Sequence, residues 1–199
     1  MSADTACPYP DVCAVAFKEW EGVCQALLSG RQSLILRKGG IKEGPGGFQP
    51  EHNAFWLYPT LVHQAQQGLK PILHASPATT ASPSDDEVEI RGLAVVERIG
   101  LVERLTKLEE LAPLHVWTAE TIEKRFHYRQ PGLYVLGVRI YRRGDPWRVP
   151  VTAEHAGCKT WVPLGEGLKT TALAPVLDAA SHEETMRVLG AVLGFGGRH

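Results

Sequence analysis

The sequence lacks any long run of apolar residues. Nothing in its 199 residues approaches the roughly 20 apolar residues that a helix needs to cross a bilayer. The first residues, MSADTACPYPDV, also lack the basic and apolar segments of a secretory signal peptide. We therefore expect a cytoplasmic protein that does not bind membranes.

Cysteine is scarce and irregularly spaced. The sequence contains four cysteines, which are Cys7, Cys13, Cys24 and Cys158. No two of them form a CxxC pair, so a zinc ribbon is excluded and free thiols are expected. Cys158 lies three residues after His155, which invites an interpretation as a nucleophile and its base, but no oxyanion-hole signature accompanies them. A buried cysteine that packs beside Trp161 is the expected outcome.

Neither sign of charge is in excess. The sequence has 21 lysine and arginine residues against 22 aspartate and glutamate residues, for a formal net charge of −1. Proteins that coat nucleic acid or an anionic membrane bind in proportion to the phosphates that they neutralise, so this class is not expected. Any anion-binding site must therefore be local.

Length and composition predict one soluble domain. The chain is 44% hydrophobic and 22% charged, and it is long enough to bury one core. We expect a single domain over residues 1–199, with a flexible N-terminus over about residues 1–11. The stretch ASPATTASPSDD, residues 75–86, offers nothing to bury and predicts a flexible surface loop.

The first part of the chain predicts one helix and two strands. Residues 12–29 predict an amphipathic helix, closed by Gly30. Its apolar side consists of Ala16, Trp20, Val23 and Leu27, and its solvent side of Lys18, Glu19 and Glu21. Residues 33–38 and 54–58 predict two paired strands, the second ended by Pro59. Their connection is too long for a tight hairpin.

The middle of the chain predicts a short helix over residues 60–68, closed by its last glycine. Strand character returns over residues 87–105. This length fits either one long bent strand with Gly92 and Gly100 at irregularities, or two strands in succession. Both alternatives predict a strongly curved sheet.

The last part of the chain predicts two helices around three strands. Thr118 can cap a helix that runs to about residue 128. The strands are predicted over residues 132–143, 147–149 and 158–164. A capping box of Ser181 and Glu184 then predicts a C-terminal helix over residues 181–194.

The order of these elements favours an α+β fold. Strands do not alternate with long helices, so a doubly wound parallel sheet is not expected. We expect a curved, mostly antiparallel sheet or a small β-barrel. An N-terminal amphipathic helix, short connecting helices and a C-terminal helix should accompany it.

Three short strings resemble the bacterial domain-of-unknown-function family 1802. They are LRKGGI at residues 36–41, PTxxHQ at 59–64 and GCxxWV at 157–162, and the resemblance covers roughly residues 14–165. Relatives of this kind are sometimes joined to restriction-endonuclease-type domains, so the resemblance implies a role near DNA, in restriction or a related defence. No such second domain is expected within these 199 residues.

The order of elements is also similar to that of the PUA-like superfamily, with its ASCH and EVE branches. The similar stretches are LLSGRQSLILRKG, RGLAVVERIGLVERL and GLYVLGVRIYRRGDPWRV. This resemblance implies a small curved β-barrel. It also implies a pocket for nucleic acid or a modified base beside the first helix and strand.

The glycine-rich stretch at residues 37–52 is the best candidate for a binding site. Its glycines let the backbone approach a ligand closely, and its basic residues suit a phosphate or carboxylate. The GxxxxGK[ST] spacing of a Walker loop is absent, and a solvated surface loop is the alternative. The predicted ligand-binding residues are Arg37, Lys38, Gly39, Gly40, Lys42, Glu43, His52 and Trp56.

A divalent metal is the alternative ligand for the same region. Glu51, His52 and His63 offer a carboxylate and two imidazoles, and Glu43 could complete the set. The spacing matches no recognised ligand pattern, and such histidines often make structural hydrogen bonds instead. A nuclease of the PD-(D/E)xK type is not expected, because VEIRG and VERL lack a lysine at the required step.

Two further stretches interleave arginine with aromatic residues: EKRFHYR at 123–129 and RIYRRGDPWR at 139–148. This pairing suits base stacking and phosphate contact on single strands. In the alternative, the aromatic rings pack in the core while the arginines extend to solvent. We expect Phe126 and Trp147 to lie in the core. For the arginines, both nucleic-acid contact and extension to solvent stay open.

These observations favour a recognition module over an enzyme. We expect it to bind a nucleotide, a modified base or a nucleic-acid end, without a cofactor. A metal-dependent hydrolase or nuclease is the first alternative, and an adaptor that docks a protein partner is the second.

Overall fold

The computed structural model describes residues 7–38, 43–44, 47–48, 51–60, 68–70, 86–155 and 159–194. The strands are β1 (Val12–Trp20), β2 (Leu34–Arg37), β3 (Glu43–Gly44), β4 (Gly47–Phe48), β5 (Ala54–Thr60), β6 (Glu87–Val102), β7 (Leu133–Pro150), β8 (Trp161–Lys169) and β9 (Leu173–Pro175). The helices are α1 (Glu21–Leu28), α2 (Leu105–Glu110), α3 (Ala119–His127) and α4 (Ala179–Leu193). Two short 3-10 turns span Ala112–Leu114 and Ala153–His155.

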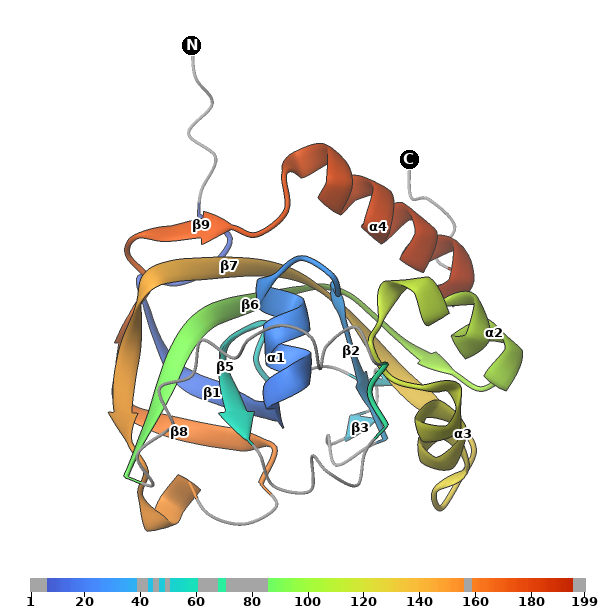
Figure 1. The fold of residues 1–199 in the computed structure, drawn as a ribbon, viewed down its shortest axis with the longest axis horizontal. Helices are drawn as coiled ribbons and strands as arrows, with labels where there is room; N and C mark the ends of the chain where they lie inside the picture. The colour runs from blue at the N-terminus through green and yellow to red at the C-terminus, as the bar shows by residue number, and fades with distance from the viewer. Residues whose placement is uncertain are drawn as a thin grey trace.

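One curved sheet of seven strands dominates the fold (Figure 1). Its order is β2-β7-β6-β5-β1-β8, and β9 adds to β7. Among the described strands only β1 and β5 pair in parallel, and the remaining pairs are antiparallel. Since β2 and β8 end the order without pairing to each other, the sheet is open. The fold is thus α+β with a mostly antiparallel sheet, as expected, and is not a closed barrel.

The long strands β6 and β7 form the spine of this sheet. They pair from Glu87 with Pro150 to Val102 with Leu133, and the register shifts near Gly92 and again before Arg98. Such irregularities bend a strand and increase its twist. Figure 1 shows the two ribbons crossing the molecule together and curving at one end.

The sheet buries side chains on both of its faces. Along β5, Phe55 and Leu57 belong to the larger core cluster, which also includes residues of α1, α3 and α4. Trp56 and Tyr58 alternate with them and belong to a smaller cluster on the other face. Figure 1 shows α1 in front of the sheet, with α2, α3 and α4 on one side of it. None of the helices in the described ranges is long and apolar enough to cross a membrane.

The predicted helix over residues 12–29 is wrong in its first half. Val12–Trp20 is strand β1, and only Glu21–Leu28 is helical. β1 lies between β5 and β8 and is buried on both faces, so its apolar residues do not alternate cleanly with polar ones. A run of this kind fits helical spacing as well as strand spacing.

The predicted pairing of the first two strands is also wrong. β2 pairs with β7, whereas β5 pairs with β1 and β6. β5 also continues through Pro59 to Thr60, because its parallel partner β1 runs to Trp20 beside it. As predicted, no tight hairpin joins β2 and β5. The prediction that these two strands pair with each other is wrong.

The later elements follow the sequence prediction more closely. Residues 87–102 form one long strand with an irregularity at Gly92, although not at Gly100. The predicted strand over 147–149 is a continuation of β7. α3 begins after Thr118, whose side chain accepts a hydrogen bond from the Thr121 N–H. The predicted short helix at 60–68 and the loop at 75–86 lie almost wholly outside the described residues.

The capping box predicted for the C-terminal helix is wrong. α4 begins at Ala179, and its N-cap is Asp178, which accepts hydrogen bonds from both the N–H and the hydroxyl of Ser181. Asp178 is an equally good cap, and it starts the helix two residues earlier than predicted.

His115 is a buried imidazole whose two ring nitrogens have no hydrogen-bond partner among the described residues. The ammonium of Lys70 lies close by, since it donates to the His115 carbonyl at 2.7 Å. Burial, and then the charge of Lys70, lower the pKa of His115 from 6.5 to about 4. The folded protein therefore holds His115 in its neutral form.

We predict that His115 makes the protein acid-sensitive. An unfolded chain protonates the imidazole near its ordinary pKa whereas the folded protein resists, so stability falls as the pH drops from about 7 to about 4. The loss attributable to this group is about 2 to 3 kcal/mol. Urea unfolding across this range should show a smaller loss for His115→Phe than for the unchanged protein. Equal losses in the two proteins would show that other groups cause the acid sensitivity.

Candidate functional site

A buried carboxylate lies at the end of β1. Glu19 shares one face of the strand with Phe17 and is only 2% exposed. Its Oε1 accepts a hydrogen bond from the Trp20 N–H at 2.9 Å, and its Oε2 has no partner among the described residues. Because a buried charge without partners is costly, this oxygen requires an explanation.

Arg37 approaches Glu19 from the end of β2. Its guanidinium lies 4.5 Å from the centre of the Phe17 ring, and its Nη2 donates to the Thr160 hydroxyl at 2.7 Å. Burial lowers the pKa of Arg37, and the charge of the Glu19 carboxylate opposes that shift. Arg37 is therefore a largely desolvated cation with a carboxylate nearby.

Arg125 reaches the same region from α3. Its guanidinium lies 4.7 Å from the centre of the Trp20 ring and 5.5 Å from that of Trp117. Burial lowers the pKa of Arg125, Glu19 opposes the shift, and Arg37 adds to it. Its Nη1 is buried and, within the described part of the chain, has no hydrogen-bond partner. We name these three side chains the Glu19–Arg37–Arg125 cluster.

The cluster has no direct ion pair. Among the contacts of the described residues, Glu19 lies within ion-pair distance of neither guanidinium. One carboxylate oxygen of Glu19 and one guanidinium nitrogen of Arg125 are thus buried and have no hydrogen-bond partner among the described residues. A polar group placed between them would satisfy both, which ordinary packing does not.

Aromatic rings surround the cluster. Trp161 lies 5.0 Å from Phe17 and 5.0 Å from His52, measured between ring centres. The indole Nε1 atoms of Trp161 and Trp117 are buried and also have no partner among the described residues. We name the rings of Phe17, Trp20, Trp117 and Trp161 the aromatic wall. It supplies flat apolar surface together with two free N–H donors.

The site lies where the two ends of the open sheet approach each other. Arg37 is the last residue of β2, and Thr160 immediately precedes β8. Their 2.7 Å hydrogen bond joins the two sheet ends through side chains, without a backbone ladder. The curvature of β6 and β7 thus brings together residues that are more than a hundred positions apart.

Lys38 makes three hydrogen bonds that hold the protein's own backbone. Its ammonium donates to the carbonyls of Phe126 at 2.6 Å and Gly132 at 2.9 Å, and to that of Gln130. These acceptors belong to the last turn of α3 and the connection that follows. A cation here also complements the negative end of the helix dipole. Lys38 therefore fixes the end of the helix that carries Arg125.

Of the other predicted site residues, two lie at the aromatic wall and Trp56 does not. Arg37 contacts the aromatic wall at Phe17, and His52 contacts it at Trp161. Trp56 is fully buried on the opposite face of the sheet, where its indole donates to the Cys13 carbonyl at 3.2 Å. It is not brought together with the cluster.

Several predicted residues lie beyond what the structure describes. Gly39, Gly40, Lys42 and His63 are outside the described residues, as is Cys158. Glu43 is described only in its backbone, which pairs with Phe48 in a two-residue ladder. Glu51 is exposed, and the described part of the chain contains no group of three side chains that could hold a metal ion.

Two residues of the cluster were not selected from the sequence. Glu19 was expected on the solvent side of a helix, which is wrong because it lies on the buried face of a strand. Arg125 belonged to a basic and aromatic stretch whose arginines were left open. Of the expected core residues in the two such stretches, Phe126 is buried and Trp147 is half-buried.

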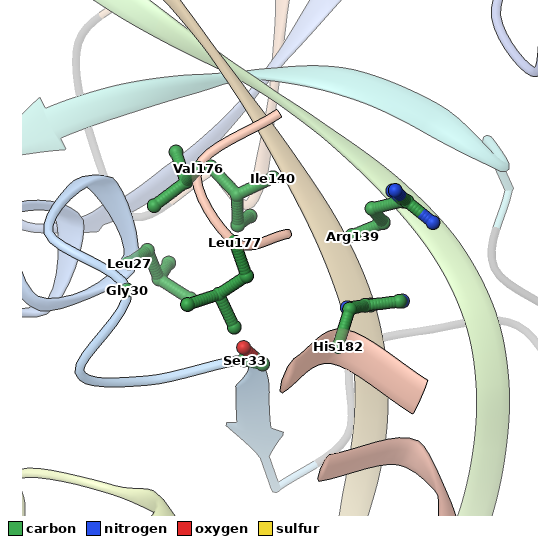
Figure 2. A pocket seen from close by; sticks show the side chains of 8 residues that line it. All are labelled: Leu27, Gly30, Ser33, Arg139, Ile140, Val176, Leu177 and His182. Atoms are coloured by element: carbon green, nitrogen blue, oxygen red, sulfur yellow. The ribbon is translucent and has the colours of Figure 1, made fainter. Parts of the chain in front are cut away.

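One small cavity of the structure does not qualify as a binding site. It lies between the α1–β2 connection, β7 and the start of α4, and Figure 2 shows Leu27, Leu177 and Ile140 around it. Its volume is about 10 Å³, which is roughly the space of one water molecule. Beside it, His182 Nε2 lies 2.7 Å from the Glu97 carboxylate, a contact that joins α4 to β6.

We predict that Lys38→Met destabilises the protein without changing the sheet. Three carbonyls lose a charged donor, so the free energy of unfolding should fall by about 1 to 2 kcal/mol. Urea denaturation measures this change directly. Lys124→Met is the matched control on α3, because that lysine forms an exposed ion pair with Glu120 and its loss should have little effect. If both substitutions have the same small effect, the hydrogen bonds of Lys38 do not stabilise the protein.

A comparison with solved structures finds proteins of similar arrangement. The crystal structure of ASCH from Zymomonas mobilis is similar at 13% identity and a TM-score of 0.42, covering 89% of this chain and 93% of that chain. The crystal structure of one mutant of that protein is 13% identical with a TM-score of 0.42, covering 91% of this chain and 99% of that chain. The crystal structure of a second mutant is 12% identical with a TM-score of 0.43, covering 87% of this chain and 96% of that chain. A likeness at this level carries no conclusion about a ligand.

The family assignment is clearer. A search of curated proteins finds no match. The profile of the family described as "Domain of unknown function (DUF1802)" matches residues 16–187. The chain therefore belongs to the DUF1802 family.

Proposed function

We propose that the protein is a recognition module that binds a nucleotide or a modified base at the Glu19–Arg37–Arg125 cluster. One observation carries this proposal. A buried carboxylate oxygen and a buried guanidinium nitrogen, beside two free indole N–H groups, all have no partner among the described residues. Groups of this kind concentrate at sites that a polar ligand completes.

The chemistry of the cluster suits a nucleobase. A carboxylate accepts hydrogen bonds from the amino and imino groups on a base edge, and indole N–H groups donate to its carbonyls and ring nitrogens. The aromatic wall supplies the kind of ring on which a base stacks, but Phe17 and Trp117 are fully buried, so a base would enter only if these side chains moved. The ligand class is therefore one with both donors and acceptors on a planar ring.

The charge of the cluster favours a ligand that also carries a negative group. Arg37 and Arg125 contribute two positive charges and Glu19 one negative charge, so the cluster is formally cationic. A guanidinium binds phosphate or carboxylate oxygens well, particularly where it is partly desolvated. Because the chain as a whole has a net charge of −1, we expect few phosphate contacts and a weak dependence of affinity on salt.

The competing explanation is that the three charges only stabilise the fold. In that case their removal would change stability alone, and no nucleotide would bind the unchanged protein. The two explanations therefore differ in a binding measurement and not merely in a melting temperature.

Calorimetric titration with common and methylated mononucleotides tests the proposal. We expect saturable binding that Glu19→Gln weakens about 10- to 100-fold, because the near-isosteric amide removes a charged acceptor. Arg125→Lys keeps the charge but loses the planar fork, and it should weaken binding as well. Thermal unfolding of each variant confirms that it is folded at the titration temperature.

A control variant separates the cluster from general charge effects. Arg187→Gln removes an exposed arginine of α4 that pairs with Glu184, and it should leave affinity unchanged. If folded Glu19→Gln binds every tested nucleotide as the unchanged protein does, the site lies elsewhere. If no nucleotide binds the unchanged protein, the recognition function is wrong and the cluster is structural.

A further inference from the structure

The end of α3 exposes an aromatic ring beside an arginine. Tyr128 follows the last turn of α3 and is 57% exposed. The guanidinium of Arg129 lies 5.2 Å from the centre of its ring. Arg129 itself is exposed and forms no ion pair among the described residues. We name Tyr128 and Arg129 the α3 rim.

The backbone of the α3 rim is held in an uncommon conformation. Arg129 has a φ of 64°, which is a left-handed value that residues other than glycine seldom adopt. The carbonyls on either side of it, at Phe126, Gln130 and Gly132, all accept hydrogen bonds from Lys38. The turn is thus fixed from beneath while its two side chains remain at the surface. A strained, exposed turn of this kind is more often found where a ligand is bound.

The α3 rim follows Arg125 of the cluster closely along the chain. Tyr128 follows Arg125 by three residues, which is about one helical turn. The Tyr128 N–H donates to the Arg125 carbonyl at 3.3 Å. Lys38, which fixes this turn, also follows Arg37 directly in the chain. Helix and strand therefore link the buried cluster to the exposed rim.

We propose that the α3 rim binds a single-stranded nucleic acid next to the nucleotide whose base occupies the cluster. Tyr128 would stack on a neighbouring base, and Arg129 would contact a backbone phosphate. This inference rests on the proposed function, and it specifies the ligand as a strand instead of a free nucleotide.

A single strand fits the α3 rim better than a duplex. An exposed ring can stack only on a base that is itself unstacked, and such bases belong to single strands, loops and ends. Tight duplex binding depends on many phosphate contacts, which a chain of net charge −1 does not provide.

The second basic and aromatic stretch is less suited to this role. Arg148 lies 3.4 Å from the Glu89 carboxylate, which also pairs with Arg91 at 2.8 Å. The indole of Trp147 donates to the Lys169 carbonyl, and the Arg143 guanidinium lies 4.5 Å from its ring. These groups already have partners, which makes Arg148 a matched control for Arg129.

The test compares a strand with a mononucleotide on the same variants. Fluorescence anisotropy would follow a labelled single strand of about ten nucleotides, of DNA and of RNA, and a duplex of equal length. Calorimetry would follow the mononucleotide. Tyr128→Ala should weaken single-strand binding about 5- to 150-fold and Tyr128→Phe much less, because stacking needs the ring and not the hydroxyl. Asparagine tolerates the left-handed conformation that Arg129 adopts. Arg129→Asn should therefore weaken strand binding and reduce the dependence of the affinity on salt.

The outcomes separate this inference from the proposed function. Support for the α3 rim requires that the unchanged protein, Tyr128→Ala and Arg129→Asn bind the mononucleotide equally. Strand binding should be weakened in these two variants and unchanged in Arg148→Gln. Mononucleotide binding without any gain in affinity for the strand would overturn the rim and leave the proposed function intact. A preference for the duplex would overturn it too. Absence of mononucleotide binding, with strand binding weakened in the rim variants, would overturn both the cluster as the base site and the proposed adjacency, and would leave the rim as a strand contact on its own.

Discussion

The ladder between β6 and β7 is the interaction on which the rest of the structure depends. It pairs the two longest strands along their whole length and bends at two register shifts. β2 adds to β7 on one side, while β5, β1 and β8 add to β6 on the other. Because the ladder is curved, the two ends of the open sheet come together, and Arg37 meets Thr160 there. A flat sheet of the same order would separate these residues.

The same curvature helps to bring the three residues of the Glu19–Arg37–Arg125 cluster together. β1 supplies Glu19 on its buried face, β2 supplies Arg37 at its end, and α3 supplies Arg125. Lys38 holds the end of α3 through three backbone carbonyls and so fixes the helix that carries Arg125. Among the described residues, four of the buried polar atoms without partners belong to this cluster and the aromatic wall, and the others lie on His115 and Arg139. Such an arrangement is costly for stability, and proteins accept such local costs mainly at functional sites.

Sequence patterns predicted the regular parts of this fold well. α3 has a threonine cap, and β6 and β7 have length and alternation that few helices share, so these elements were identified. β1 was missed because a central strand that is buried on both faces has no two-residue alternation. The error then spread to strand pairing, since β5 pairs in parallel with β1 and not with β2.

The same error explains why Glu19 was missed. Glu19 looks like a solvent-side residue as long as β1 is taken for a helix, and it becomes anomalous only when strand alternation places it beside Phe17. Arg37 and His52 were predicted because they flank a glycine-rich loop, and both contact the aromatic wall. Lys38 looked equally suited to a ligand, since no sequence pattern reveals that distant carbonyls will meet its ammonium.

The most direct test of the cluster as a binding site is an NMR titration that follows the indole N–H signals of the five tryptophans with a mononucleotide. The indole groups of Trp117 and Trp161 are without partners among the described residues, whereas those of Trp56 and Trp147 donate to backbone carbonyls. Binding at the cluster should shift the signals of Trp117 and Trp161 strongly and leave those of Trp56 and Trp147 nearly unchanged. Saturable binding that shifts only Trp147, or none of the five, would contradict the account.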